Sequence, residues 1–332
     1  MNKRLLTLLF VVIAIISAFL VLRGNQKDKF LTEEIYSMNT IANIKIAGKE
    51  RKEAMDAVIE EINYLNGLFD DFSEASDVSR INKSAGNNFE KVSEDTIDII
   101  NKAIDCFKMS DGSFDITIAP VEALWGFKDG NYKVPGEEEI KDALESVGIE
   151  NIEITDSSVK LKNKGARIDL GGIAKGYTLD KIKEILDKYE VECAIVNLGG
   201  NILTYKNPQS GSWKIGIKHP RREGIIGEIE VTGTKFISTS GDYERFFMNG
   251  DKRYCHIINP FNGYPSALIT SVSVISDSGY IGDALSTAFF VKGQDYAFKI
   301  AREVAVEAVV VDSNLEVYAT EGIKEYLKLE TR

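Results

Sequence analysis

The chain has 332 residues, of which 44% are hydrophobic and 27% charged, as in ordinary folded proteins. Forty basic against fifty-one acidic residues give a net charge of −11, which argues against nucleic acid as a partner because such proteins usually present a basic surface. An anionic ligand therefore needs local help from a metal, a lysine or a helix N-terminus. The three cysteines are widely spaced, so we expect small buried hydrophobes. Two histidines are too few for a soft-metal site, so any metal is expected to take oxygen ligands, as Mg²⁺, Ca²⁺ or Mn²⁺ do.

An unbroken apolar run from Leu5 to Leu22 follows Lys3 and Arg4. As a helix it reaches roughly 27 Å at ~1.5 Å per residue, close to the ~30 Å hydrocarbon core of a membrane. The cationic start favours a cytoplasmic N-terminus. We therefore expect an uncleaved anchor at the cell membrane with an extracytoplasmic domain; a cleaved signal peptide and secretion are the alternative. The expected division is an anchor at 1–23, a linker at 24–32 and one domain at 33–332.

Periodicity predicts the first elements. Period-two alternation predicts a strand around Thr40–Ile46, and apolar residues at helical spacing predict a helix from Ala54 to Leu68. A second helix is expected to open at Ser93, a good N-cap. The segment FDITIAP, residues 114–120, is predicted to be extended, and the stretch from Lys128 to Glu139 is predicted to be an exposed excursion.

The rest of the chain is dominated by strand signals. Residues 152–161 alternate like a hairpin, and Asp169 is expected to end a strand directly before a helix that starts at the following glycines. The segment CAIVNLGGN predicts a buried strand broken by paired glycines. A helix is expected to start near Asp283, and the chain then ends in helix, strand and hairpin. Strand-heavy runs joined to long helices without βαβ alternation predict an α+β fold with mixed or antiparallel sheets and packed helices. Further strands are predicted at 213–218, 225–232, 254–258 and 270–276.

The segment GDALSTA places a carboxylate and a hydroxyl four residues apart. In a helix, Asp283 and Thr287 project from one face, which is a partial shell for a hard cation. The alternative is that Asp283 caps the helix and Thr287 bonds back to a carbonyl. Spacing alone favours that alternative.

The segment RIDLGGIAKGY predicts an anion site. Asp169 is followed by two glycines and a helix start, with Lys175 one turn in, and free amides at a helix N-terminus bind anions. Paired glycines also occur at such joints for packing alone. The spacing is neither that of a Walker loop nor that of the Rossmann fingerprint.

A histidine before a Pro/Asn/Gly turn is a third candidate. His256 is a possible general base near a phosphoryl centre, and the alternative is a histidine that hydrogen-bonds a loop. His219, in KHPRRE, is expected to be a surface residue.

Taken together, these segments resemble the ApbE family, the FAD:protein FMN transferases. The resemblance runs from about Tyr36 to the final strands, with the motifs in family order. It rests on YSMNT, SDVSRIN, SDGSFDITIAP, RIDLGGIAKGY, VNLGGN, STSGDYERFF, HIINPFNGYP and GDALSTA.

The resemblance implies a role for each matched residue. Asp283, Thr287 and the backbone carbonyl of Gly172 would bind Mg²⁺, with Mn²⁺ as the alternative, and Ser286 stands where some members have an aspartate. Asp169 and Lys175 would contact the flavin nucleotide. Asn39 and Asn259 replace a small residue and an aspartate that are usual in the family. The other matched cofactor contacts are Met38, Phe72, Ser113, Phe114, Asp115, His256 and Ile258.

The implied reaction transfers FMN from FAD, the substrate, to a threonine or serine hydroxyl of an acceptor protein, and AMP leaves. His256 or a metal-adjacent carboxylate such as Asp283 would accept the hydroxyl proton. The implied acceptors include extracytoplasmic flavin domains of membrane redox complexes. Two alternatives stay open: a hydrolase that releases FMN and AMP, and a non-catalytic FAD-binding protein.

Overall fold

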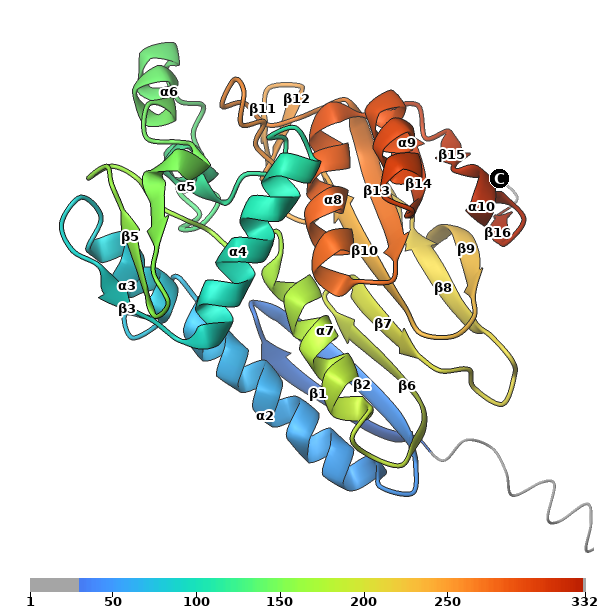
Figure 1. Ribbon diagram of the computed structural model, residues 1–332. Helices are drawn as coiled ribbons and strands as arrows, with labels where there is room; N and C mark the ends of the chain where they lie inside the picture. The colour runs from blue at the N-terminus through green and yellow to red at the C-terminus, as the bar shows by residue number, and fades with distance from the viewer. Residues whose placement is uncertain (1–29, 331–332) are drawn as a thin grey trace, which may run out of the picture.

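A large antiparallel sheet forms the centre of the computed structural model, which describes residues 30–330 (Figure 1). Every strand pair in this sheet is antiparallel, so the predicted α+β class is confirmed and the sheets are of the antiparallel kind. In spatial order its strands are β1 (Leu31–Ser37), β2 (Thr40–Gly48), β6 (Val191–Leu198), β7 (Asn201–Tyr205), β10 (Lys235–Gly241), β13 (Ile269–Ser276), β14 (Glu307–Asp312) and β15 (Val317–Ala319).

Helices cover one face of this sheet (Figure 1). The apolar stripe of the first helix, which includes Val58 and Ile62, packs with Ile44 and Ile46 of β2 in one fully buried cluster. Such a stripe at helical spacing is what buries an amphipathic helix. The helices on this face are α2 (Arg51–Phe69), α7 (Ala174–Leu186), α8 (Gly279–Lys292) and α9 (Gln294–Glu303), and α4 (Glu94–Met109) packs on α2 and α8.

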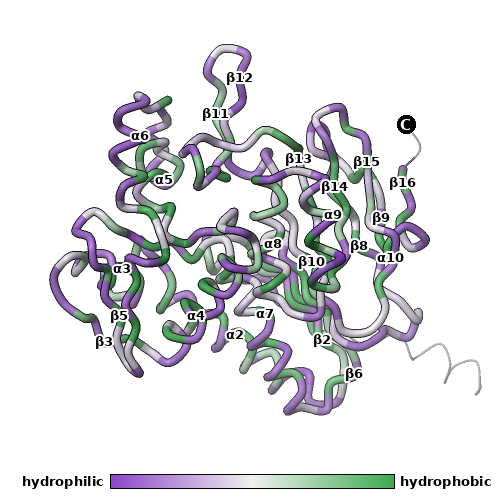
Figure 2. Tube along the Cα trace, turned by 45° about the horizontal axis from the view of Figure 1, so that its top comes forward, coloured by the Kyte–Doolittle hydropathy of each residue, from purple (hydrophilic) through white to green (hydrophobic). Residues whose placement is uncertain are grey.

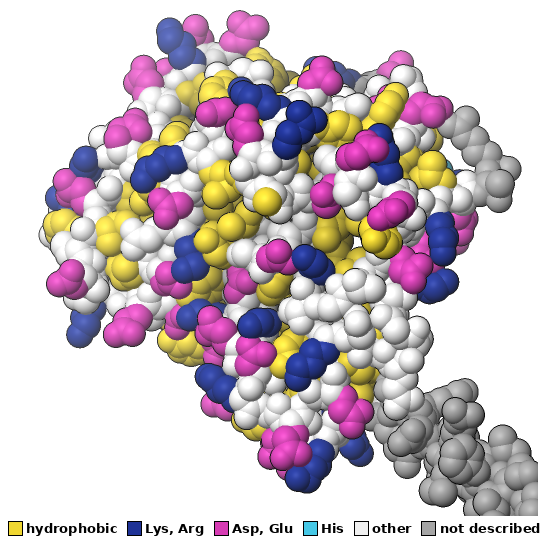
Figure 3. All heavy atoms as spheres, turned by 45° about the vertical axis from the view of Figure 1, so that its right-hand side comes forward, with side chains coloured by type: hydrophobic (Ala, Val, Ile, Leu, Met, Phe, Trp, Pro, Cys, Tyr) yellow, Lys and Arg dark blue, Asp and Glu magenta, His cyan; other side chains and the backbone are white. Residues whose placement is uncertain are grey.

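A small sheet covers the opposite face at the β10–β15 end. It consists of β8 (Trp213–Lys218), β9 (Ile225–Val231) and β16 (Leu327–Leu329). In Figure 1 this sheet lies next to α10 (Glu321–Lys324). Alternate residues of β8 and β9 are buried against the main sheet. Strands with one covered face show this period of two. On the side of the molecule seen in Figure 3, acidic and basic side chains are interspersed.

Shorter elements form a lobe beside α4 (Figures 1 and 2). Trp125 is fully buried in its apolar cluster and donates a hydrogen bond from Nε1 to the carbonyl of Gly263, 2.9 Å away. The elements of the lobe are α3 (Asp77–Lys83), β3 (Glu90–Lys91), the 3₁₀ turns η1 (Ile116–Ile118) and η2 (Ile149–Asn151), α5 (Ala119–Trp125), α6 (Glu137–Leu144), β4 (Ile152–Ile154), β5 (Ser158–Leu161), β11 (Phe246–Asn249) and β12 (Lys252–Cys255).

Most elements predicted from periodicity are present. The helix at α2, the hairpin at 152–161 and the strands at 40–46, 213–218, 225–232 and 270–276 are confirmed within a few residues. Ser93 caps α4 as predicted, because its Oγ accepts the amide hydrogen of Thr96 at 3.1 Å. The three cysteines are buried, as expected.

The extended conformation predicted for FDITIAP is wrong. Residues 116–118 form η1, and α5 begins at Ala119. The reason is local: Asp115 Oδ1 accepts hydrogen bonds from the backbone N and Oγ1 of Thr117, at 2.7 and 2.6 Å. Pro120 at the start of α5 suits a first helical turn.

Several boundaries also differ from prediction. Asp169 does not end a strand, since residues 165–169 are irregular, and the strand predicted at 254–258 ends at Cys255. β1 begins at Leu31, inside the predicted linker. The sequence pattern indicates no strand at β1 or at β10. His219 is only 9% exposed, so its assignment to the surface is wrong.

The predicted anchor at 1–23 lies outside the described residues, as does the linker up to residue 29. Among residues 30–330, none of the helices combines the length and the apolar character that a membrane crossing requires. The anchor therefore stays a prediction.

Candidate active site

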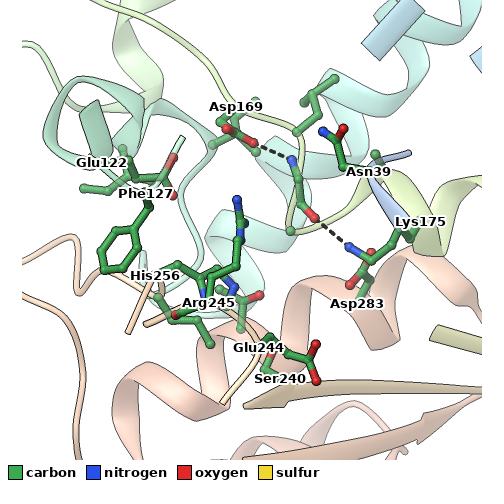
Figure 4. A pocket seen from close by; sticks show the side chains of 18 of the residues that line it. Asn39, Glu122, Phe127, Asp169, Lys175, Ser240, Glu244, Arg245, His256 and Asp283 are labelled. Carbon is green, nitrogen blue, oxygen red and sulfur yellow. Dashed lines mark hydrogen bonds between the residues drawn. The ribbon is translucent and has the colours of Figure 1, made fainter. Parts of the chain in front are cut away.

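A cavity of about 430 Å³ is lined by the C-terminal end of α2, the start of α7, the middle of α8 and the base of the β11–β12 hairpin. Figure 4 shows part of its lining. The cavity gathers segments more than 240 residues apart in the sequence. Of the predicted site residues, Ser286 alone is absent from its wall. Those that line it are Met38, Phe72, Ser113, Phe114, Asp115, Asp169, Gly172, Lys175, His256, Ile258, Asp283 and Thr287.

The crossing of α7 and α8 positions Asp283. A Cβ on Gly176 would lie 2.2 Å from the carbonyl oxygen of Gly279, and a Cβ on Gly279 would lie 2.2 Å from that of Gly176. Only glycine on both helices permits this approach. At the crossing, Asp283 Oδ2 accepts the backbone amide hydrogen of Gly176 at 2.9 Å.

Asp283 is not a helix cap, because α8 begins one turn earlier than predicted. The first amides of α8 are capped from α7: Asp180 accepts the amide hydrogens of Gly279 at 2.8 Å and Tyr280 at 2.9 Å. A carboxylate at a helix N-terminus satisfies free amides there. Asp283 is thereby left on the helix face that Thr287 shares, facing the cavity.

Thr287 lies close to the glycine loop before α7. A Cβ on Gly172 would lie 3.3 Å from Thr287 Oγ1 and 3.1 Å from Cε2 of Phe114, so a larger residue there would press on both side chains. Among the described residues, the side-chain oxygens of Asp283 and Thr287 make one hydrogen bond, the one that the Gly176 amide donates. The second Asp283 oxygen and the Thr287 hydroxyl are therefore available to a ligand.

Ser286 lies on α8 next to Asp283 and bonds to its backbone, away from the cavity wall. Its buried Oγ lies 2.8 Å from Ser240 Oγ and donates to the carbonyl of Asp283, also at 2.8 Å. The predicted contact of Ser286 with the metal site is therefore an indirect one in this structure, through the backbone of Asp283.

The loop before α7 lines the cavity between Asp169 and Lys175 (Figure 4). Asp169 Oδ1 accepts the Gly171 amide hydrogen at 2.6 Å, and Lys175 Nζ donates to the Gly171 carbonyl at 3.1 Å. The amides of Ile173 and Ala174 donate to the Leu170 carbonyl, and that of Gly176 donates to Asp283. Most amides at this helix start therefore have partners within the protein, no strand precedes them, and the anion site stays a prediction that rests on Lys175.

Lys128 lines the cavity, although the sequence pattern predicts that it lies in an exposed stretch. Its Nζ forms ion pairs with Asp71 and Asp169, and its side chain is 20% exposed. Lys128 therefore joins the rim after α2 to the loop that holds Asp169. The pairing spans 57 and 41 residues, so no local pattern indicates it.

Glu122 of α5 is a second missed residue. It lines the cavity near Asp169 and Phe127 (Figure 4). Burial and the nearby charge of Asp169 raise its pKa to about 8, against opposing effects of Lys128 and Arg245. A charged residue inside the apolar segment IAPVEALWGF was the available signal.

Negative side chains outnumber positive ones around the cavity. The three cations are Lys128, Lys175 and Arg245. An anionic ligand would meet net repulsion here unless a cation accompanied it. The seven carboxylates are Asp70, Asp71, Asp115, Glu122, Asp169, Glu244 and Asp283.

His256 is half-buried in the cavity wall. Its Nδ1 lies 3.3 Å from the carbonyl oxygen of Arg245, whose backbone also accepts the His256 amide hydrogen at 3.1 Å. Burial and the positive charge of Arg245 lower its pKa to about 3. The imidazole is therefore neutral at pH 7, and on its own it is a weak base.

Two predicted contacts form the rim near the β1–β2 turn. Met38 and Asn39 both have positive φ, 52° and 57°, and the Met38 amide donates to Asn66 Oδ1 at 2.9 Å. Asn tolerates this conformation well. Phe72, after α2, is 57% exposed and lines the mouth.

The Ser113–Asp115 segment lines the cavity, and its polar groups are largely bonded within the segment and its surroundings. The Ser113 hydroxyl donates to the Ser110 carbonyl at 2.6 Å, and Asp115 is engaged with Thr117. Burial raises the pKa of Asp115. The Phe114 ring is the part of this segment that lies beside Gly172, next to the Thr287 hydroxyl.

The donor set suits a hard cation. It offers a carboxylate, a hydroxyl and the nearby backbone of Gly172, all oxygen ligands. Residues 30–330 contain no group of three or more His, Cys, Asp or Glu side chains arranged to hold a metal. Mg²⁺ fits such a sparse site, because it is usually bound by one or two carboxylates together with substrate phosphates and water.

Comparison with known proteins identifies several that are similar in sequence to this chain. A FAD:protein FMN transferase of Klebsiella pneumoniae is 33% identical over 248 residues, which cover 73% of this chain and 77% of the relative. One from Vibrio cholerae is 28% identical over 331 residues, covering 94% and 97%.

Solved structures agree. The ApbE protein of Thermotoga maritima superposes with a TM-score of 0.84 at 31% identity, covering 90% of this chain and 99% of that one. The flavin transferase ApbE from Vibrio cholerae gives 0.79 at 26%, with coverage of 90% and 99%. The ApbE family profile matches residues 38–310. The predicted resemblance is therefore confirmed, and the chain belongs to the ApbE family.

Proposed function

We propose that the protein transfers FMN from FAD to a threonine or serine hydroxyl of an acceptor flavoprotein, with release of AMP, in a Mg²⁺-dependent reaction. One observation carries the proposal. The hard-oxygen pair Asp283/Thr287 and Lys175, a cation in the first turn of α7, line the same cavity, which is otherwise too acidic for a pyrophosphate. The names of the relatives, FAD:protein FMN transferase, support the same reaction.

The binding roles follow from the geometry. Asp283, Thr287 and the Gly172 carbonyl would hold Mg²⁺, or Mn²⁺ in its place. When bound, the metal would neutralise pyrophosphate charge and that of the departing phosphate. Lys175, in the first turn of α7, would contact the phosphates.

The ring systems of FAD would contact the residues around Met38 and Phe72, together with Ile258 and Pro260, all of which line the cavity. Apolar and aromatic walls with few polar groups are usual for such ligands. Asp169, held by Lys128 and Gly171, would be a fixed polar contact among them.

In the transfer step the acceptor oxygen bonds to the phosphorus on the FMN side, and the bond from that phosphorus to the AMP oxygen breaks. The products are AMP and a phosphodiester between FMN and the acceptor. His256 or Asp283 would take the hydroxyl proton. The low pKa of His256 favours a role in orienting the hydroxyl, but the negative charge of a bound dinucleotide would raise this pKa and its strength as a base.

We also propose that the protein works at the outer face of the cell membrane, tethered by residues 1–23. The cationic start and the apolar run Leu5–Leu22 support this placement. The acceptors would then be extracytoplasmic flavin domains of membrane redox complexes.

The test uses the full chain with FAD, Mg²⁺ and a threonine-containing flavin-acceptor domain, and reads the acceptor by mass spectrometry. The expected result is a gain of one FMN, abolished by chelator and by Asp283→Ala. Asp105→Ala is the matched control, because Asp105 is 71% exposed on α4. FMN and AMP in solution with an unmodified acceptor would instead identify a hydrolase, and intact bound FAD a non-catalytic binding protein.

A further inference from the structure

The β11–β12 hairpin stands out from the body of the fold beside the cavity (Figure 2). Among the described residues, β11 and β12 hydrogen-bond as strands only with each other. A two-stranded hairpin is marginally stable by itself, so something must hold it in place. An aromatic stack does this from one face.

That anchoring face is formed by the cross-strand pair Phe247 and Tyr254. Their rings stack with centroids 5.3 Å apart, Phe247 stacks on Tyr132 at 5.3 Å, and Tyr254 lies 5.3 Å from Trp125. Offset and tilted aromatic pairs of this kind each contribute about 0.5–1.5 kcal/mol. The inner face thus accounts for the position of the hairpin.

The other face of the hairpin has no such partner among the residues that the structure describes. Successive side chains of a strand point to opposite faces, so Phe246, Met248 and Arg253 lie opposite the stack. Phe246 is 37% exposed and Met248 is 52% exposed. The Arg253 guanidinium carbon lies 3.7 Å from the centroid of the Phe246 ring. Aromatic residues, methionine and arginine are the types enriched in protein interfaces.

This outer face leads directly into the cavity. Glu244 and Arg245, just before β11, and His256, just after β12, line it. Met248 is three residues from Arg245, or about 10 Å along a strand. An extended segment of a few residues that rests on the hairpin therefore reaches the cavity beside His256.

The charges favour an acidic occupant. Arg253 lies on the outer face and Arg245 at its base, whereas Lys252 lies over the Tyr254 ring on the stacked face. The whole chain carries a net charge of −11. Glu244 at the base is paired with Lys218 at 3.3 Å. Asp251 in the turn between the strands is the other acidic residue of the hairpin. The outer face thus combines apolar side chains with the charge of Arg253, and Arg245 adds a second positive charge at the edge of the cavity.

We propose that the outer face of the β11–β12 hairpin docks the acceptor polypeptide. The fitting segment is extended, places an apolar side chain on Phe246 and Met248 and an acidic one near Arg253, and delivers its hydroxyl to the cavity. This inference rests on the proposed transferase function, and names the surface that distinguishes a protein acceptor from water.

The test compares two double variants of the full chain. Phe246→Ser/Met248→Ser alters the hairpin, and Tyr318→Ser/Leu329→Ser is the matched control on β15 and β16, with exposures of 39% and 54%. The probe is the threonine-containing flavin-acceptor domain, used as such for transfer and with its threonine replaced by valine for calorimetric binding.

We expect the hairpin variant to raise the KM for the acceptor and the Kd of the valine form by about tenfold or more, a loss of about 1.4 kcal/mol. FAD affinity, kcat at saturating acceptor and thermal unfolding should match the control. Arg253→Glu should weaken binding further, and salt should reduce that difference because the contact is exposed.

Unchanged acceptor KM and Kd in the hairpin variant would overturn the docking surface, even if the wild type transfers FMN. Equal losses in both double variants would do so as well. Self-association or binding to anionic vesicles that the hairpin variant abolishes, with acceptor affinity unchanged, would assign the face to another occupant. Hairpin-dependent binding without any FMN-linked product would instead overturn the transferase function alone.

Discussion

The contact between α7 and α8 positions Asp283 in the cavity, and a substitution at Gly176 tests this. Gly176→Ala places a methyl group 2.2 Å from the Gly279 carbonyl oxygen and 2.6 Å from Asp283 Cβ. Both neighbours are rigid, since one is helix backbone and the other is the first atom of a side chain. The helices must therefore separate by about 1 Å, because ordinary contacts of this kind are near 3.5 Å.

The expected cost has two parts. Overpacking of a rigid contact costs about 1–3 kcal/mol, and loss of the hydrogen bond from the Gly176 amide to the Asp283 carboxylate costs about 1.5–3 kcal/mol. The better helix propensity of alanine returns about 1 kcal/mol. The net loss of about 1.5–5 kcal/mol lowers the Tm by about 2–8 °C, because the entropy of unfolding of a protein of this size gives roughly 1.5 °C per kcal/mol.

The assay is thermal unfolding together with Mg²⁺ titration in the presence of FAD. Gly67→Ala is the control, because Gly67 lies within α2 and a Cβ there would meet no atom within 4 Å. That substitution should stabilise the protein by up to about 1 kcal/mol. We expect Gly176→Ala to weaken Mg²⁺ binding as well, since Asp283 moves with α8.

A Gly176→Ala protein with wild-type Tm and Mg²⁺ affinity would refute this account of the crossing. So would an equal fall in Tm for Gly67→Ala, because alanine would then be harmful in helices that have room for it.

Three further predictions concern single side chains of the cavity. Thr287→Val, which keeps the shape but removes the hydroxyl, should lower Mg²⁺ affinity and transfer at least tenfold, whereas Thr287→Ser should retain both; equal activity of the two variants would exclude the hydroxyl as a ligand. Lys128→Met should lower the free energy of unfolding by about 3 kcal/mol, because it leaves two partly buried carboxylates without their partner, and Lys128→Arg should restore most of it in urea titrations. No difference between those two variants would mean that the bridge to Asp71 and Asp169 contributes nothing. Glu122 has a folded-state pKa of about 8 against an ordinary 4.5, so the folded protein binds more protons between these values and the free energy of unfolding falls as the pH rises through this window. Glu122→Gln should show a smaller fall between about pH 5 and about pH 9, and parallel curves for the two proteins would contradict the raised pKa.

Local sequence was sufficient for much of the fold. The stripe of α2 and the alternation of β8 and β9 are repeats of 3.6 and 2 residues, which a window of a dozen residues reveals. Ser93 is likewise a local signal, since a cap bonds to an amide three residues away. The order of the motifs also determined the family, and the cavity gathers nearly every residue they nominated.

Tertiary contacts decided the meaning of Asp283. The sequence favoured a capping role because it allows α8 to begin at that residue. The structure begins α8 at Gly279, because Asp180 of α7 supplies the cap across the helix crossing. The carboxylate of Asp283 then faces the cavity.

Sequence spacing also leaves the roles of the acidic and basic residues around the cavity undecided. Lys128 pairs with Asp71 and Asp169, and Glu122 acquires its raised pKa from that neighbourhood. Such properties depend on distance through space and on exclusion of water, which spacing along the chain does not encode. The sequence by itself therefore determined many of the helices and strands, the family and most of the predicted residues that line the cavity. Only the folded chain decided which oxygens are left for a ligand and which charges surround them, because both depend on how the helices cross.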